Sequence, residues 1–223
     1  MQEYLLKFIL KSDACFSRGD GTAGEVDIEV QQDPYGLPFL NGRALKGLLH
    51  EEAAELVEAL AMAGSKTHDW NLISNRIFGE PGSNLNTQGL VKFGDATLPL
   101  DFRSQIIYKV KSKSGLDAHQ VLRLLTSTRT QTANDETGAP KPETLRVMRV
   151  ILRETPFEAE LTLDSKLEEM DLAFLSACVK ALRRAGSNKT RGMGKLQSDL
   201  IDFTSKKSIL ETNFSKFEEA ISR

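Results

Sequence analysis

Two groups of regular segments, one at each end of the chain, restrict the folds that this sequence can adopt. At the start, residues 4–10 are apolar on both faces of a predicted strand, which indicates a central place in a sheet. A helix follows over residues 44–63, where apolar side chains recur at helical spacing. The other predicted segments are a strand or extended segment at 26–30, a helix at 70–78, a strand from 90 to 96, a strand at 157–163, a helix at 170–184, a strand at 195–203 and a short helix at 209–221. Two β–α–β groups predict an α+β fold with a ferredoxin-like or RRM-like core and insertions between its elements.

A polar stretch over residues 127–145 interrupts this pattern. It contains almost no large apolar side chain, so it contributes little to a core. It lies between a helix-like segment at 119–125 and a strand-like segment at 147–152, and it therefore predicts a long projecting loop or hairpin. Loops of this length are usually functional or disordered. We expect one domain over residues 1–223 with this insertion in it.

The composition excludes several classes of protein. With 40% hydrophobic and 27% charged residues, the chain is typical of a globular protein. It has no apolar run near the roughly 20 residues of a membrane helix, and its first residues lack the pattern of a signal peptide. The cysteines, Cys15 and Cys178, are too far apart to suggest a disulfide framework or a metal motif. We therefore expect no membrane partner and a cytoplasmic location.

The net charge of −2 hides a segregation of charge along the chain. Residues 103–153 contain ten lysines and arginines against four acids, and residues 180–195 contain six against none. Each cluster could be an ordinary solvated face. Both coincide with predicted loops, however, and this favours a surface that binds the phosphates of a nucleic acid.

The segment GRALKG at residues 42–47 opens the first long helix. The N-terminus of a helix has free backbone N–H groups and a partial positive charge, and both attract anions. Arg43 and Lys46 lie in this first turn, where a phosphate would bind. The alternative is a surface helix with incidental charges.

A glycine-rich segment, GSNKTRGMG at residues 186–194, joins the predicted helix at 170–184 to the predicted strand at 195–203. Glycine permits close approach of the backbone to a ligand, here at Gly192 and Gly194, and Lys189 and Arg191 add positive charge. The segment lacks the Gly-Lys-Ser/Thr ending of a nucleotide-binding loop and does not follow a strand. It therefore predicts either RNA contacts or only a tight connection.

Asp27 is the strongest candidate for chemistry, because it lies beside a glycine-rich loop and before the helix at residue 44. A carboxylate at this place could bind Mg²⁺ or take a proton from a ribose 2′-OH. The alternative is an outward-facing acid like its neighbours Glu25 and Glu29. The sequence shows no catalytic grouping around the three isolated histidines, His50, His68 and His119.

The order of these motifs resembles that of the RAMP superfamily. PFLNGRALKG at residues 38–47 is similar to the family's PxIPGSSLKG, and IFG at 77–79 with VKFGDA at 91–96 is similar to its LFG and FsDA pair. The segment at 186–194 looks like its C-terminal glycine-rich loop. VD at 26–27 precedes DP at 33–34, and this order is similar to that in the repeated backbone subunit of type III CRISPR complexes, which cleaves target RNA. This resemblance covers residues 4 to 203.

The resemblance implies a function and a set of site residues. The chain would bind guide RNA and target RNA beside copies of itself or like RAMP subunits, together with a large polymerase-like subunit. Asp27, with Mg²⁺, would be the residue needed for cleavage. ANDETGA at 133–139 resembles the family's thumb hairpin, although its spacing is compressed and Glu136 replaces a residue that is often basic. The expected RNA-binding residues are Arg43, Lys46, Arg129, Lys141, Lys189, Arg191, Gly192 and Gly194.

Three alternatives remain open from the sequence. A RAMP subunit of purely structural function would bind guide RNA and cleave nothing. A guide-processing endoribonuclease of the same superfamily would use a histidine such as His50. A ferredoxin-like interaction domain without RNA is disfavoured by the two basic loops.

Overall fold

The chain folds around a four-stranded antiparallel sheet with the strand order β2-β5-β1-β6. The computed structural model describes residues 1–65, 67–80, 87–112, 115–132 and 145–222. The strands of the sheet are β1 (Gln2–Leu10), β2 (Val91–Phe93), β5 (Pro156–Leu163) and β6 (Leu196–Asp202). In this order β5 lies between the two strands of the first β–α–β group, and β1 lies between those of the second. This interleaving is the ferredoxin-like topology, and the predicted α+β fold is confirmed.

Strand β1 is central, as its apolar run predicts. It pairs with β5 on one side and β6 on the other, so that Leu6 lies beside Ala159 and Leu200. The even-numbered side chains from residue 4 to residue 10 are buried, and those of residues 5, 7 and 9 are only half-buried. Burial of a leucine or phenylalanine side chain stabilises a fold by about 1.5–3 kcal/mol. The core therefore lies on one face of the sheet.

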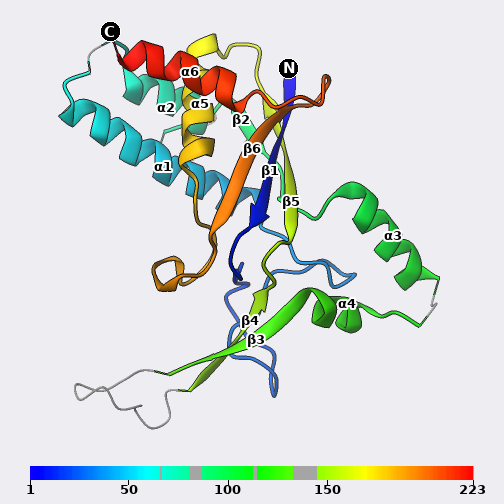
Figure 1. Cartoon of the computed structure of the whole chain (residues 1–223). Coiled ribbons are helices and arrows are strands. Elements are labelled where there is room, and N and C mark those ends of the chain that lie inside the picture. Colours follow the sequence, from blue (N-terminus) through cyan, green and yellow to red (C-terminus); the bar gives the residue numbers. More distant parts are fainter. Residues whose placement is uncertain (66, 81–86, 113–114, 133–144, 223) are drawn as a thin grey trace, which may run out of the picture.

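Four helices cover that face (Figure 1). They are α1 (Gly42–Met62), α2 (Trp70–Phe78), α5 (Glu169–Ala181) and α6 (Leu210–Ile221). Helix α5 is the most deeply buried of them, and it contacts α1, α2 and α6. Trp70 of α2 stacks on Phe174 of α5 with a centroid distance of 5.8 Å. The described part of the chain has no helix of the length and apolar character needed to span a membrane.

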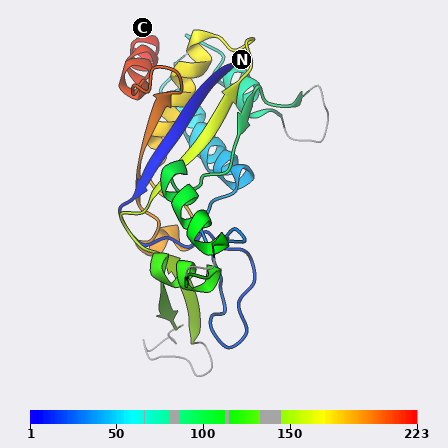
Figure 2. The same ribbon diagram turned by 90° about the vertical axis from the view of Figure 1, so that its right-hand side faces the viewer.

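The insertion between β2 and β5 builds a second part beyond the end of the sheet. It contains α3 (Leu100–Lys111), α4 (Ala118–Leu125), β3 (Thr126–Gln131) and β4 (Arg146–Ile151). Strands β3 and β4 form a two-stranded hairpin, which confirms the predicted hairpin around residues 127–145. Figure 2 shows this hairpin at the end of the molecule opposite to both chain termini. The motif predicted for the thumb, at residues 133–139, lies outside the described residues.

An irregular segment over residues 12–41 joins the two parts. Ala14 forms a bridge with Ile151 of the hairpin, and Ile28 forms one with Met148. The predicted strand at residues 26–30 is thus extended, but it has only isolated pairings. Helix α3 is absent from the sequence-based prediction, because none of its residues is fully buried and its apolar pattern is weak.

Candidate RNA interface

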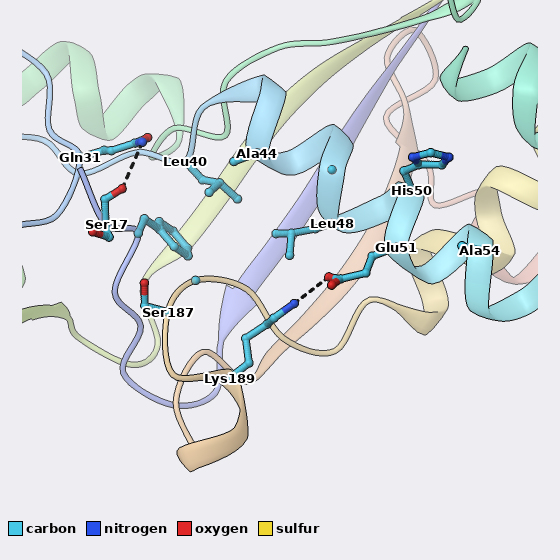
Figure 3. Close-up of a pocket in the computed structure, with 13 residues that line it drawn as sticks. Ser17, Gln31, Leu40, Ala44, Leu48, His50, Glu51, Ala54, Ser187 and Lys189 are labelled. Carbon is cyan, nitrogen blue, oxygen red and sulfur yellow. Dashed lines mark hydrogen bonds and ion pairs between the residues drawn. The ribbon is translucent and has the colours of Figure 1, made fainter. Parts of the chain in front are cut away.

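A groove of about 630 Å³ lies between helix α1 and the glycine-rich loop at residues 186–194 (Figure 3). Leu48 and Glu51 of α1 form one wall, and Ser187 and Lys189 of the loop form the other. Gln31 closes one end, where its Nε2 donates to the carbonyl of Ser17 at 3.3 Å. The fold therefore brings together the two segments that the sequence predicts for RNA binding, although they are more than a hundred residues apart.

The first amides of α1 are already occupied. The side chain of Asn41 accepts a hydrogen bond from the Ala44 N–H at 2.7 Å, and Asp95 accepts one from the Gly42 N–H, also at 2.7 Å. Gly42 is required by close packing, because a Cβ there would lie 2.2 Å from the carbonyl oxygen of Phe93. The Asp95 carboxylate therefore stabilises the N-terminus of α1, which has a partial positive charge. An RNA phosphate would be bound here by side chains and not by these two amides.

The cations predicted around the groove differ in their surroundings. Arg43 is exposed and Lys46 is half-buried, and among the residues that the structure describes neither has an ion-pair partner. Arg191 is also exposed, in a short 3₁₀ turn of the loop. These three side chains are available to phosphates. Lys141 lies outside the described residues.

Two other predicted RNA-binding cations are paired with carboxylates of the same chain. The ammonium of Lys189 lies 2.7 Å from Glu51 across the groove. The guanidinium of Arg129 donates from Nε and Nη2 to one oxygen of Asp13, whose other oxygen accepts from the Arg153 N–H. To bind RNA, Lys189 would therefore have to leave Glu51 and pair with a phosphate.

The glycines of the loop have different functions. Gly186 and Gly194 have positive φ angles of 91° and 69°, and a Cβ at either would lie within 2.5 Å of a backbone oxygen, of Cys15 and Ala185 respectively. Both therefore shape the loop, and Gly194 is buried. Gly192 also has a positive φ but faces open space. Of the two glycines predicted to approach RNA, Gly192 is the accessible one.

Asp27 lies beside the start of β4, at the loop end of the paired strands of the hairpin, with its side chain exposed. Its Oδ2 accepts a hydrogen bond from the Val147 N–H at 2.6 Å, and its own N–H donates to the Val147 carbonyl at 2.7 Å. It lines a hollow of about 390 Å³ together with residues 21–26. Asp27 therefore fixes the start of β4 and faces solvent beside the glycine-rich loop at 19–24.

The neighbours of Asp27 are not the plain solvated acids of the alternative interpretation. Glu29 is 1% exposed and accepts from Nε of Arg149 at 2.8 Å. Arg149, 5% exposed, also donates from Nη2 to Glu25 at 2.7 Å. The prediction that His119 is isolated is wrong, because its Nε2 lies 3.2 Å from Oε1 of Glu25. This network joins residues up to 124 positions apart, and a basic residue within a predicted buried strand was its only signal in the sequence.

A magnesium ion at Asp27 would have few protein ligands. Within the described ranges, no group of three His, Cys, Asp or Glu side chains is placed to hold a metal ion. Mg²⁺ in proteins often uses one or two carboxylates and completes its shell with waters and substrate phosphates. The exposed Asp27 carboxylate fits that pattern only if the RNA supplies ligands.

These features define a ferredoxin-like protein with a groove between α1 and the glycine-rich loop and a hairpin beyond one end of its sheet. The RAMP superfamily matches residues 13–197, and the chain belongs to that superfamily. No curated protein matches the sequence.

Solved structures with the same fold include two chains from type III-B Cmr-beta. One is bound to cognate target RNA; it has 14% sequence identity and a TM-score of 0.65, and the match covers 90% of this chain and 97% of that one. The other is in the apo state; it has 14% sequence identity and a TM-score of 0.62, and the match covers 91% of this chain and 98% of that one. A chain of a type IV-B CRISPR complex is also similar, with 14% sequence identity and a TM-score of 0.58, and the match covers 90% of this chain and 91% of that one. At this identity the likeness shows the fold alone.

Proposed function

We propose that this chain is a repeated backbone subunit of a type III CRISPR complex and holds guide RNA in the groove between α1 and residues 186–194. The observation that carries the proposal is the groove itself, which brings Lys189 of the glycine-rich loop opposite α1, the helix that contains Lys46. Membership of the RAMP superfamily supports it, and so does the origin of similar folds in CRISPR assemblies. The partners in this proposal are guide RNA, target RNA, like RAMP subunits and a large polymerase-like subunit.

Binding in the groove would be independent of sequence. Lysine and arginine side chains contact phosphates, whereas base pairing with the guide supplies the specificity. Lys189 would leave Glu51 for a phosphate, and this exchange costs little because both side chains are partly exposed. The hairpin, as a thumb, would displace one base pair of the guide–target duplex.

We further propose that Asp27 takes part in cleavage of the paired target RNA. The 2′-OH next to the displaced base would attack its own phosphate, giving a 2′,3′-cyclic phosphate and a 5′-OH. The Asp27 carboxylate would accept the 2′-OH proton or orient the hydroxyl, and Val147 holds it in place. A Mg²⁺ ion bound there would stabilise negative charge on the phosphate. Positioning of the linkage would supply most of the rate.

A non-cleaving scaffold is the second candidate, and one observation favours it. The hydrogen bond from the Val147 N–H gives Asp27 a structural function that needs no catalysis. Alanine at Asp27 separates the two candidates, because a scaffold subunit would leave target cleavage unchanged.

A guide-processing enzyme that uses His50 has less support. The His50 ring is exposed and stacks on Phe78 at 5.2 Å, and it takes part in no hydrogen bond or ion pair among the described residues. Purification from the native host tests all three functions. A discrete RNA in a large ribonucleoprotein is expected, whereas a small RNA-free species would contradict the proposal.

A further inference from the structure

A second hollow, of about 460 Å³, lies at the base of the hairpin on the side of helix α4. Its wall contains Glu25, His119, Arg123 and Arg149, and hydroxyl side chains of β3 complete it. Glu25 also lines the hollow that contains Asp27, so the two hollows are adjacent. An imidazole, a carboxylate and two guanidinium groups thus meet beside the proposed cleavage residue.

His119 and Arg123 are held in this hollow by the local structure of α4. They are four residues apart and therefore lie on one face of the helix. The helix begins with a capping box between Asp117 and Gln120, which fixes its first turn where His119 lies. Val121 and the residue after it are buried and anchor the helix to the core. His119 itself remains 54% exposed.

Glu25 fixes the imidazole of His119. Its Oε1 lies 3.2 Å from Nε2 of the ring, and its Oε2 accepts from Arg149 at 2.7 Å. Arg149 is held in turn by the buried Glu29. The hydrogen bond with His119, with a further contribution from Arg149, lowers the pKa of Glu25, which keeps it a carboxylate. A carboxylate that orients an exposed histidine is the usual arrangement around a general acid or base.

We propose that His119 is the general acid of target-RNA cleavage, with Glu25 as its positioning residue and Arg123 as a contact to the scissile phosphate. This inference rests on the proposed function. As the 2′-oxygen bonds to phosphorus and its proton leaves to Asp27, the bond from phosphorus to the 5′-oxygen breaks. The leaving oxygen takes its proton from Nδ1 of the His119 imidazolium, while Nε2 stays on Glu25. Protons and electrons balance with no further reactant.

Asp27 and Glu25, the residue that orients His119, are both bonded to strand β4. Asp27 is anchored at Val147 and Glu25 at Arg149, two residues further along β4. A strand rises about 3.3 Å per residue, so the Cα atoms of these two strand residues are roughly 7 Å apart. An acid and a base that flank one phosphodiester each stand about 3 Å from one of its oxygens. Arg123, which is exposed in the same hollow, would contact a non-bridging oxygen.

The test uses the assembled complex with its guide and two target RNAs. One target is ordinary, and the other has sulfur in place of the 5′-oxygen at the scissile linkage. A thiolate leaves without a proton, so it needs no general acid. We expect His119→Gln to slow cleavage of the ordinary target by about 10²-fold or more and to leave the sulfur target near the wild-type rate. His68→Gln is the matched control, since His68 contacts Trp70 on another face of the protein.

The outcomes separate the two proposals. A wild-type complex that cleaves neither target overturns the proposed function. Cleavage of the ordinary target by His119→Gln at the wild-type rate overturns the general acid alone, and so does equal slowing of both targets.

If the variant does not assemble, the wild-type pH–rate profile decides. The charged groups that face His119 are Glu25, Arg123 and Arg149. A general acid acts in its protonated form, so the rate on the ordinary target should fall at high pH. The sulfur target should show no such fall, and the same fall on both targets refutes the assignment.

Discussion

Replacement of Glu29 by alanine should destabilise the protein strongly. Glu29 is 1% exposed and bonded to Nε of Arg149, which is itself buried. The variant leaves a guanidinium in the interior with only the more exposed Glu25 as a partner. Removal of one partner of a buried ion pair typically costs about 3–5 kcal/mol, because the remaining charge is desolvated without compensation. For a chain of this size that corresponds to a fall in Tm of roughly 6–20 °C.

Urea unfolding followed by circular dichroism measures this effect. The midpoint should fall in Glu29→Ala while the slope m stays constant, because the surface exposed on unfolding is unchanged. Glu51→Ala is the control, since its pair with Lys189 is exposed and such pairs contribute at most about 1 kcal/mol. The double variant Glu29→Met with Arg149→Met should recover part of the loss. A Glu29→Ala protein within about 1 kcal/mol of the wild type would refute the reasoning.

Three further predictions concern RNA and the hairpin. Asp27→Ala in the assembled complex should lower target cleavage at least about 10²-fold with little change in target affinity, measured with labelled RNA resolved by length; cleavage at the wild-type rate would favour a scaffold. Lys46→Ala and Arg191→Ala should each reduce the log–log salt slope of RNA binding by about 0.7–0.9 in filter binding, and an unchanged slope would remove that residue from the interface. Deletion of residues 133–142 should leave the circular dichroism spectrum native, because the β3–β4 pairing lies outside the deletion; an unfolded product would contradict a projecting thumb.

The predicted elements that agree with the structure are those whose pattern is local. Helix α2 was predicted with the bounds that it has, and β1 and β5 differ from their predictions by two residues or fewer at each end. When one face of a helix or strand is covered, apolar residues recur in its sequence at helical or strand spacing. Helix α3 has no such clear apolar pattern, because none of its side chains is fully buried. The hollows have no local sequence pattern either, because each is lined by segments that are distant in sequence.

The sequence by itself determined the order of the β–α–β groups, the polar hairpin segment and the glycine-rich basic loop that borders the groove. Only the tertiary structure decided the partners of the charged residues. Lys189 and Glu51 are 138 positions apart, and Arg149 and Glu29 are 120 apart, so no local pattern relates them. Ion pairs form between whichever side chains the closed chain brings within a few ångströms. For that reason the sequence does not distinguish Glu25 from Glu29, whereas in the fold Glu25 orients a histidine and Glu29 is buried on an arginine.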